Sequence, residues 1–225
     1  FAVTIFLTCS ENPSDPQVEA PTIPPQSTFV MDFDDFDATS LSKAASKSNW
    51  IWAAGNVAVW NAVLVVTLAV PVAAFAESFN HDPVLQADGS WLWSYSFKVL
   101  GLNYTAKLYG ALELDGVKWD MYITQQGLYE DFHWFSGKSD LLLTTGYWEL
   151  NYKPTDPKPF LYIDWHRSNA DLSGDIKYTN IIPEGDENGS YIFQGFNQPG
   201  DFTGMYDIFT ASSENLVQIK WNYDC

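Results

Sequence analysis

From residue 90 to residue 222, apolar side chains recur at every second position, and this alternation constrains the fold more than any other feature of the chain. In residues 91–97 and again in residues 117–123, every second residue is large and apolar. Such a period of two predicts β-strands with one buried face. The connections between these segments are short, and Asp115-Gly116 is typical of a hairpin turn. Because they are too short for crossover helices, we expect an antiparallel meander.

About ten strands follow one another in this region. The expected strands are residues 91–97, 104–108, 117–123, 131–136, 144–152, 160–167, 174–181, 190–194, 204–210 and 216–222. A long sheet with two free edges tends to aggregate, and closure removes the edges. We therefore expect an up-and-down meander that forms a closed or nearly closed barrel.

Residues 43–78 form the one clear helical segment of the sequence. Between residues 57 and 75 only Asn61 and Thr67 are polar, so the helix is apolar on all sides and must be enclosed. Lipid could enclose it, since the stretch is long enough to span a bilayer, or the following sheet could. We favour the sheet, because the strands need something to cover their apolar face. The predicted fold is mainly β: a barrel around one long apolar N-terminal helix, with residues 29–225 as a single domain and residues 29–33 as its first strand.

The N-terminal residues have a different composition. Residues 1–7 are uniformly apolar and lead to Cys9, and residues 10–28 are rich in proline. This order resembles the end of a bacterial lipoprotein signal peptide, in which the cysteine receives lipid and a polar tether follows. The resemblance implies a signal remnant at 1–8, lipidation of Cys9, a tether at 9–28, and a lipid anchor in the membrane of the cell envelope. The alternative is an ordinary buried strand with Cys9 as a core residue. Cys225 would then be able to pair with Cys9, or it has a partner beyond this sequence.

The charge of the chain excludes one class of function. With 28 Asp and Glu against 11 Lys and Arg, the net charge is −17. A polyanion would be repelled, so we expect no nucleic-acid partner. Hydrophobic residues make up 46% of the chain, which also excludes wholesale disorder.

Motifs for catalysis are lacking in the sequence. There is no nucleophile elbow, phosphate-binding loop, dinucleotide fingerprint or zinc-protease motif. The three histidines have no metal-ligand spacing, so we expect neither a metal nor a cofactor.

The best candidates for catalysis are polar residues of the later strands. Asp164 and His166 lie two residues apart and so share one face of a strand, where a carboxylate can orient an imidazole ring. Glu149, Asp120 and Asp164 could supply the two carboxylates that a glycan hydrolase needs. The simpler interpretation is that all are solvent-facing residues that alternate with a buried core.

Tryptophan occurs in most of the predicted strands and has two explanations. Aromatic rings are good strand residues that bury a large area, and they also serve as platforms for sugars or apolar ligands. Trp134, Trp165 and the neighbouring His133 are the candidates for ligand binding.

The chain as a whole resembles a group of uncharacterised envelope lipoproteins of the Bacteroidetes type. The resemblance is carried by segments such as residues 21–25, 29–33, 134–137 and 176–180, and covers most of residues 9–222. It implies an envelope location, periplasmic or on the cell surface, and a barrel-like β fold, but no activity. We therefore expect a non-enzymatic lipoprotein that is structural or binds an apolar or saccharide ligand, with a glycan hydrolase as the alternative.

Overall fold

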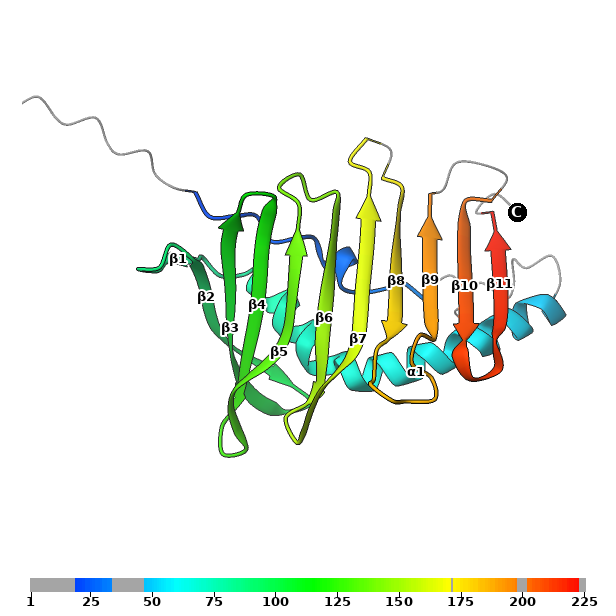
Figure 1. The fold of residues 1–225 in the computed structure, drawn as a ribbon, viewed down its shortest axis with the longest axis horizontal. Helices are drawn as coiled ribbons and strands as arrows, with labels where there is room; N and C mark the ends of the chain where they lie inside the picture. The colour runs from blue at the N-terminus through cyan, green and yellow to red at the C-terminus, as the bar shows by residue number, and fades with distance from the viewer. Residues whose placement is uncertain (1–18, 34–46, 171, 198–201, 223–225) are drawn as a thin grey trace, which may run out of the picture.

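The sheet is a single antiparallel meander of eleven strands (Figure 1). The structure is a computed structural model that describes residues 19–33, 47–170, 172–197 and 202–222. Each strand pairs with its neighbours in sequence, from β1 to β11, which confirms the predicted meander. The strands are β1 (Val84–Leu85), β2 (Trp91–Val99), β3 (Leu102–Glu113), β4 (Gly116–Gln125), β5 (Tyr129–Ser139), β6 (Thr145–Lys153), β7 (Asp156–Arg167), β8 (Gly174–Asn180), β9 (Tyr191–Phe196), β10 (Gly204–Thr210) and β11 (Asn215–Trp221).

The predicted barrel is wrong, because the sheet is open. Closure requires hydrogen bonds between the first and last strands, whereas among the described residues β1 pairs with β2 and β11 with β10. A first strand of two residues is too short to close an eleven-stranded sheet, and a short edge strand offers little surface for unwanted pairing.

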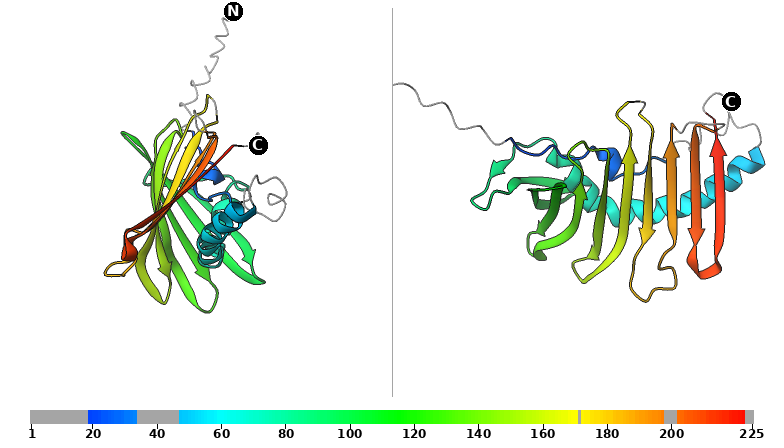
Figure 2. Two further views of the ribbon diagram at one scale, coloured as in Figure 1. Left: turned by 90° about the vertical axis from the view of Figure 1, so that its right-hand side faces the viewer. Right: turned by 45° about the horizontal axis from the view of Figure 1, so that its top comes forward.

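The prediction of a sheet wrapped around one long apolar helix at residues 43–78 is wrong as well. The helix α1 (Lys47–Ser78) lies along one face of the open sheet, as both views in Figure 2 show. Residues 43–46 lie outside the described residues. Leu64, Leu68 and Phe75 are buried, whereas Val66 is 78% exposed, so the helix covers the sheet without being enclosed by it. Among the helical residues that the structure describes, none belongs to a segment long and apolar enough to cross a membrane.

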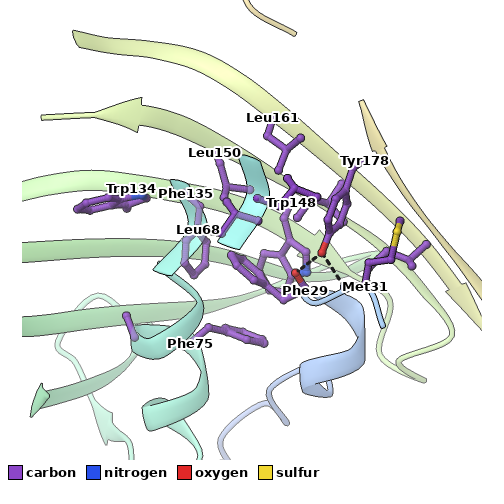
Figure 3. Packing of buried hydrophobic residues seen from close by; sticks show 14 of the residues in the cluster. Phe29, Met31, Leu68, Phe75, Trp134, Phe135, Trp148, Leu150, Leu161 and Tyr178 are labelled. Carbon is purple, nitrogen blue, oxygen red and sulfur yellow. Dashed lines mark hydrogen bonds between the residues drawn. The ribbon is translucent and has the colours of Figure 1, made fainter. Parts of the chain in front are cut away.

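Residues 19–33 lie against the same face of the sheet as α1, with a 3-10 turn, η1 (Gln26–Thr28), in the middle. This segment includes residues 19–28 of the expected tether. The strand predicted at residues 29–33 is wrong, because side chains rather than a neighbouring strand satisfy the backbone. The hydroxyl of Tyr178 accepts a hydrogen bond from Met31 N at 2.7 Å and donates one to Phe29 O at 2.9 Å (Figure 3). Gln194 bonds both the N–H and the carbonyl of Asp32 in the same way.

Phe29 is the centre of the packing between this segment, α1 and the sheet. Its ring is fully buried and lies 4.9 Å from that of Phe75 on α1, 4.8 Å from Phe135 on β5 and 5.7 Å from Trp148 on β6 (Figure 3). Aromatic rings at such separations attract one another beyond the area that they bury. One residue of the N-terminal segment therefore joins the three parts of the core.

The tryptophans of the covered face pack directly on glycines of neighbouring strands. The pairs are Trp119 on Gly110, Trp148 on Gly137 and Trp165 on Gly146. A Cβ atom at residue 137 would lie 2.3 Å from Cε3 of Trp148 and 2.5 Å from the carbonyl oxygen of Tyr147, closer than atoms can approach. The absence of a side chain at these glycines makes room for the indole rings.

Candidate functional site

The face of the sheet that points away from α1 carries aromatic and charged side chains. The strand register places alternate residues on this face, which we call the open face. Its principal side chains are Lys107, Tyr109, Lys118, Asp120, Tyr122, His133, Tyr147, Glu149, Tyr162, Asp164, His166, Asp175, Lys177, Tyr191, Phe193, Asp207 and Phe209. Most of them are half-buried, so rings and charges are both within reach of a ligand.

A cavity of about 440 Å³ lies on the open face, over β3 and β4, and we call it the tyrosine groove. Tyr109 and Tyr122 meet in it edge to face, with ring centroids 5.9 Å apart. The ring of Tyr122 also stacks on that of His133 at 4.8 Å. The remaining lining comes from Asp88, Ser90, Lys107, Ala111, Lys118, Asp120 and Asp131.

Two of the three carboxylates that line the groove lie beside basic side chains, and the third, Asp88, accepts hydrogen bonds from Ser90 N and Oγ. Nζ of Lys107 lies 2.7 Å from Oδ2 of Asp131, and Nζ of Lys118 lies 3.0 Å from Oδ2 of Asp120. The second oxygen of Asp120 lies 3.0 Å from Nε2 of His133. The groove therefore offers hydrogen-bonding groups without a large net charge.

Asp120 is held in its ionised form by these partners. Burial by itself would raise the pKa of this carboxyl, but the hydrogen bonds from His133 and Lys118 and their charges outweigh it, so the pKa lies below the ordinary value. A carboxylate of this kind accepts hydrogen bonds only. It is suited to bind hydroxyl groups rather than to donate a proton.

Of the catalytic candidates, Asp120 lies in the groove, whereas Glu149, Asp164 and His166 lie on another part of the open face, over β6 and β7. Glu149 is the cross-strand partner of Tyr162, and Asp164 is the partner of Tyr147. The two tyrosine rings stack at 5.4 Å. The structure thus brings Glu149 and Asp164 onto neighbouring strands, as a diagonal pair around two rings.

The hydrogen bond of His166 goes to Asp175 of β8 and not along its own strand to Asp164. Nδ1 of His166 lies 3.0 Å from Oδ1 of Asp175. Burial raises the pKa of Asp164, although the charges of Lys177 and His166 oppose the shift. Asp164 and Glu149 line neither the tyrosine groove nor a second cavity at the turn between β4 and β5. A glycan hydrolase would need two carboxylates that face each other across a cleft, whereas Glu149 and Asp164 lie on adjacent strands of one sheet face.

The ligand-binding candidates are divided between the two faces. His133 lies beside the groove, but Trp134 and Trp165 are on the covered face and only 6% and 1% exposed. The rings that do reach the open face are tyrosines, such as Tyr109, Tyr122 and Tyr147. In the sequence these tyrosines alternate with the buried apolar residues of their strands. Because successive residues of a strand point to opposite faces, this placement could have identified them as residues of the open face.

A second cavity, of about 530 Å³, lies at the turn between β4 and β5. Its lining includes Tyr104, Tyr129 and residues 126–128 of the turn. Burial raises the pKa of Tyr129, whose ring is partly covered. The lining consists mainly of hairpin residues and lacks the compensated ion pairs that characterise the tyrosine groove.

The remaining sequence-based expectations concern the two cysteines and a metal site. Cys9 and Cys225 both lie beyond the described residues. Within the described ranges, no group of three or more His, Cys, Asp or Glu side chains is arranged to hold a metal ion.

Comparison with known proteins gives no assignment. No protein-family model matches the chain, and no match was found among curated proteins or solved structures. Inference about function therefore depends on the geometry of the open face.

Proposed function

We propose that this protein is a non-enzymatic binding protein of the bacterial envelope and that it binds a saccharide in the tyrosine groove. The observation that carries the proposal is the combination, in one cavity, of two tyrosine rings with charge-compensated polar groups. A pyranose ring has the complementary surface: apolar C–H faces surrounded by hydroxyl groups.

Each part of the groove has a counterpart in such a ligand. The rings of Tyr109 and Tyr122 provide apolar area on which a sugar face can stack. The carboxylates of Asp120 and Asp131 accept hydrogen bonds from hydroxyls, and Lys107 and Lys118 donate them. A few polar groups placed around an apolar surface are typical of small-molecule sites.

The same lining argues against the other ligands considered. A purely apolar ligand would bury Asp120 and its two basic partners without replacing their hydrogen bonds to water, which is costly. A polyanion would meet a chain with a net charge of −17. An uncharged polyol avoids both penalties.

The proposal is tested by measuring saccharide binding with tyrosine variants. We expect wild-type protein to bind at least one member of a panel of neutral oligosaccharides by titration calorimetry. Tyr122→Ala should weaken that binding about tenfold, or ~1.4 kcal/mol, whereas Tyr122→Phe, which keeps the ring, should retain it. Phe202→Ala, which removes an exposed ring outside the groove, is the matched control. Equal binding by wild type and Tyr122→Ala would contradict a role for the groove.

The envelope location depends on the N-terminal cysteine. We propose that Cys9 is lipidated and anchors the protein in the membrane. Labelled palmitate supplied to an expressing bacterium should be incorporated into the wild type and lost in Cys9→Ala. An unlabelled wild type would refute the lipoprotein assignment and leave the saccharide site unaffected.

A glycan hydrolase remains the second candidate, on one observation. The raised pKa of Asp164 is what a general acid needs, and Glu149 lies on the adjacent strand. If the protein were a hydrolase, new reducing ends would appear when it is incubated with a bound glycan, and Asp164→Asn would abolish them. Binding without such products favours the non-enzymatic function.

A further inference from the structure

A second pair of stacked tyrosines, Tyr147 and Tyr162, lies on the open face at a distance from the groove. The strand register connects it to Tyr109 of the groove through one continuous row of cross-strand partners. That row is Tyr109, Asp120, Ser136, Glu149 and Tyr162, one residue from each of β3 to β7. Directly paired residues lie side by side on the same face. The row therefore runs across the strands as a track with an aromatic ring at each end.

The length of the track is set by the spacing of the strands. Neighbouring strands lie about 4.8 Å apart, so four spacings separate Tyr109 from Tyr162 by about 19 Å. One pyranose unit of an extended glycan advances by about one strand spacing. A chain of about five units would reach from one pair of rings to the other.

The residues between the rings are polar and are suited to hydroxyl groups. Asp120, Ser136 and Glu149 provide carboxylate and hydroxyl oxygens along the track. The nearby Lys138 is neutralised by Glu113 at 2.8 Å and by Asp115 at 2.6 Å. The middle of the track therefore has hydrogen-bonding groups without an unpaired cationic centre that would select an acidic sugar.

We propose that the ligand of the open face is a linear, uncharged glycan with an extended, β-1,4-linked chain, which runs across the strands from the tyrosine groove to Tyr147 and Tyr162. This inference rests on the proposed saccharide-binding function and adds the class of glycan and its direction. An extended chain follows a sheet face, whereas a helical chain such as an α-1,4-linked glucan would curve away after a few units.

A macromolecular partner of another kind fits this surface less well. The centre of a protein interface is depleted in Asp, Glu and Lys, whereas here the carboxylates of Asp120 and Glu149 lie between the rings. The same argument applies to a second copy of this chain. An elongated polyol fits better, because it has apolar faces that can stack on the terminal rings and hydroxyl groups that can bind the polar side chains between them.

The experiment compares short and long oligosaccharides on the full chain. Cello-, xylo- and manno-oligosaccharides of two and six units, together with maltohexaose, are titrated against the wild type. For at least one of the three extended series, we expect the hexasaccharide to bind more than about tenfold tighter than the disaccharide, because the second pair of rings adds contacts to a chain that is already held. Tyr162→Ala should reduce hexasaccharide affinity to the level of the disaccharide and leave disaccharide affinity unchanged. Tyr162→Phe keeps the ring and should behave as the wild type, which separates stacking from any effect on folding.

The possible failures have distinct meanings. Equal affinity for two and six units, or no effect of Tyr162→Ala, would limit binding to the groove and overturn this inference while leaving the proposed function intact. Tighter binding of maltohexaose than of every extended hexasaccharide would overturn the extended chain. If the wild type is a dimer that Tyr162→Ala dissociates, the face binds a second copy and the inference is wrong. Absence of binding to every oligosaccharide would refute the proposed function itself.

Discussion

The buried hydroxyl of Tyr178 should make a large contribution to the free energy of unfolding. It links β8 to the N-terminal segment, because it accepts a hydrogen bond from Met31 N and donates one to Phe29 O. Tyr178 is only 1% exposed, so water cannot replace either bond. Tyr178→Phe removes one oxygen atom and keeps the ring, so it tests the contribution of these two hydrogen bonds alone.

The size of the effect follows from the two groups that lose a partner. A buried donor or acceptor left unsatisfied costs about 1–3 kcal/mol. Two such groups give an expected loss of about 2–6 kcal/mol in the free energy of unfolding, with the lower part of the range applying if the segment moves to admit water. This is a large fraction of the stability of a typical domain.

The assay is urea denaturation followed by tryptophan fluorescence and circular dichroism. Tyr162→Phe, on the open face, is the matched control and should change the free energy of unfolding by no more than about 0.5 kcal/mol. If Tyr178→Phe is as stable as the control, the N-terminal segment is not held by this hydroxyl, and the account of why residues 29–33 do not form a strand is wrong.

Three further predictions concern stability. Gly137→Ala should lower the free energy of unfolding by about 1–3 kcal/mol, because its Cβ would overlap the ring of Trp148 and the backbone of Tyr147. Gly55→Ala should raise the free energy of unfolding by about 0.5–1 kcal/mol, because residue 55 lies in a helix with open space around it. Both effects are measured as shifts of the denaturation midpoint. Burial raises the pKa of Tyr95 and Tyr129 above the ordinary value of 10.0, so the unfolded state loses its protons first. Stability should therefore be independent of these groups below about pH 10 and fall as the pH rises beyond it, and a flat profile from pH 9 to 12 would contradict this. The pKa of Asp120 is lowered, so Asp120→Asn should be less stable than the wild type near neutral pH, and the difference should shrink as the pH falls below the ordinary value of 3.8.

The strands could be predicted from the sequence because their signal is local. The alternation in residues 91–97 and 117–123 corresponds to β2 and β4, and the hairpin at Asp115-Gly116 joins β3 to β4. In a meander each strand pairs with its neighbour in sequence, so periodicity and turn chemistry together determine the topology.

The way in which the apolar face is covered could not be predicted in the same manner. Closure into a barrel and coverage by other segments both satisfy the alternating pattern, and the choice depends on tertiary packing. Residues 29–33 look like a strand locally, but their backbone partners include Tyr178, 147 residues away from Met31. The candidate site was only partly predicted for a related reason. Asp120, His133 and Asp164 were recognisable by residue type. The alternation could assign the tyrosines to the open face, but the register was needed to show which of them lie side by side there.

The position of the N-terminal segment has a consequence for biosynthesis. Phe29 is bonded to a residue that is 149 positions further along the chain. At a translation rate of about 5–20 residues per second, roughly 7–30 s pass between the emergence of this phenylalanine from the ribosome and that of its partner. During that interval strands β2 to β7 are still being made, and the backbone of the segment lacks its hydrogen bonds to Tyr178 of β8. A nascent chain of this kind should depend on a holding chaperone until its eighth strand has been made.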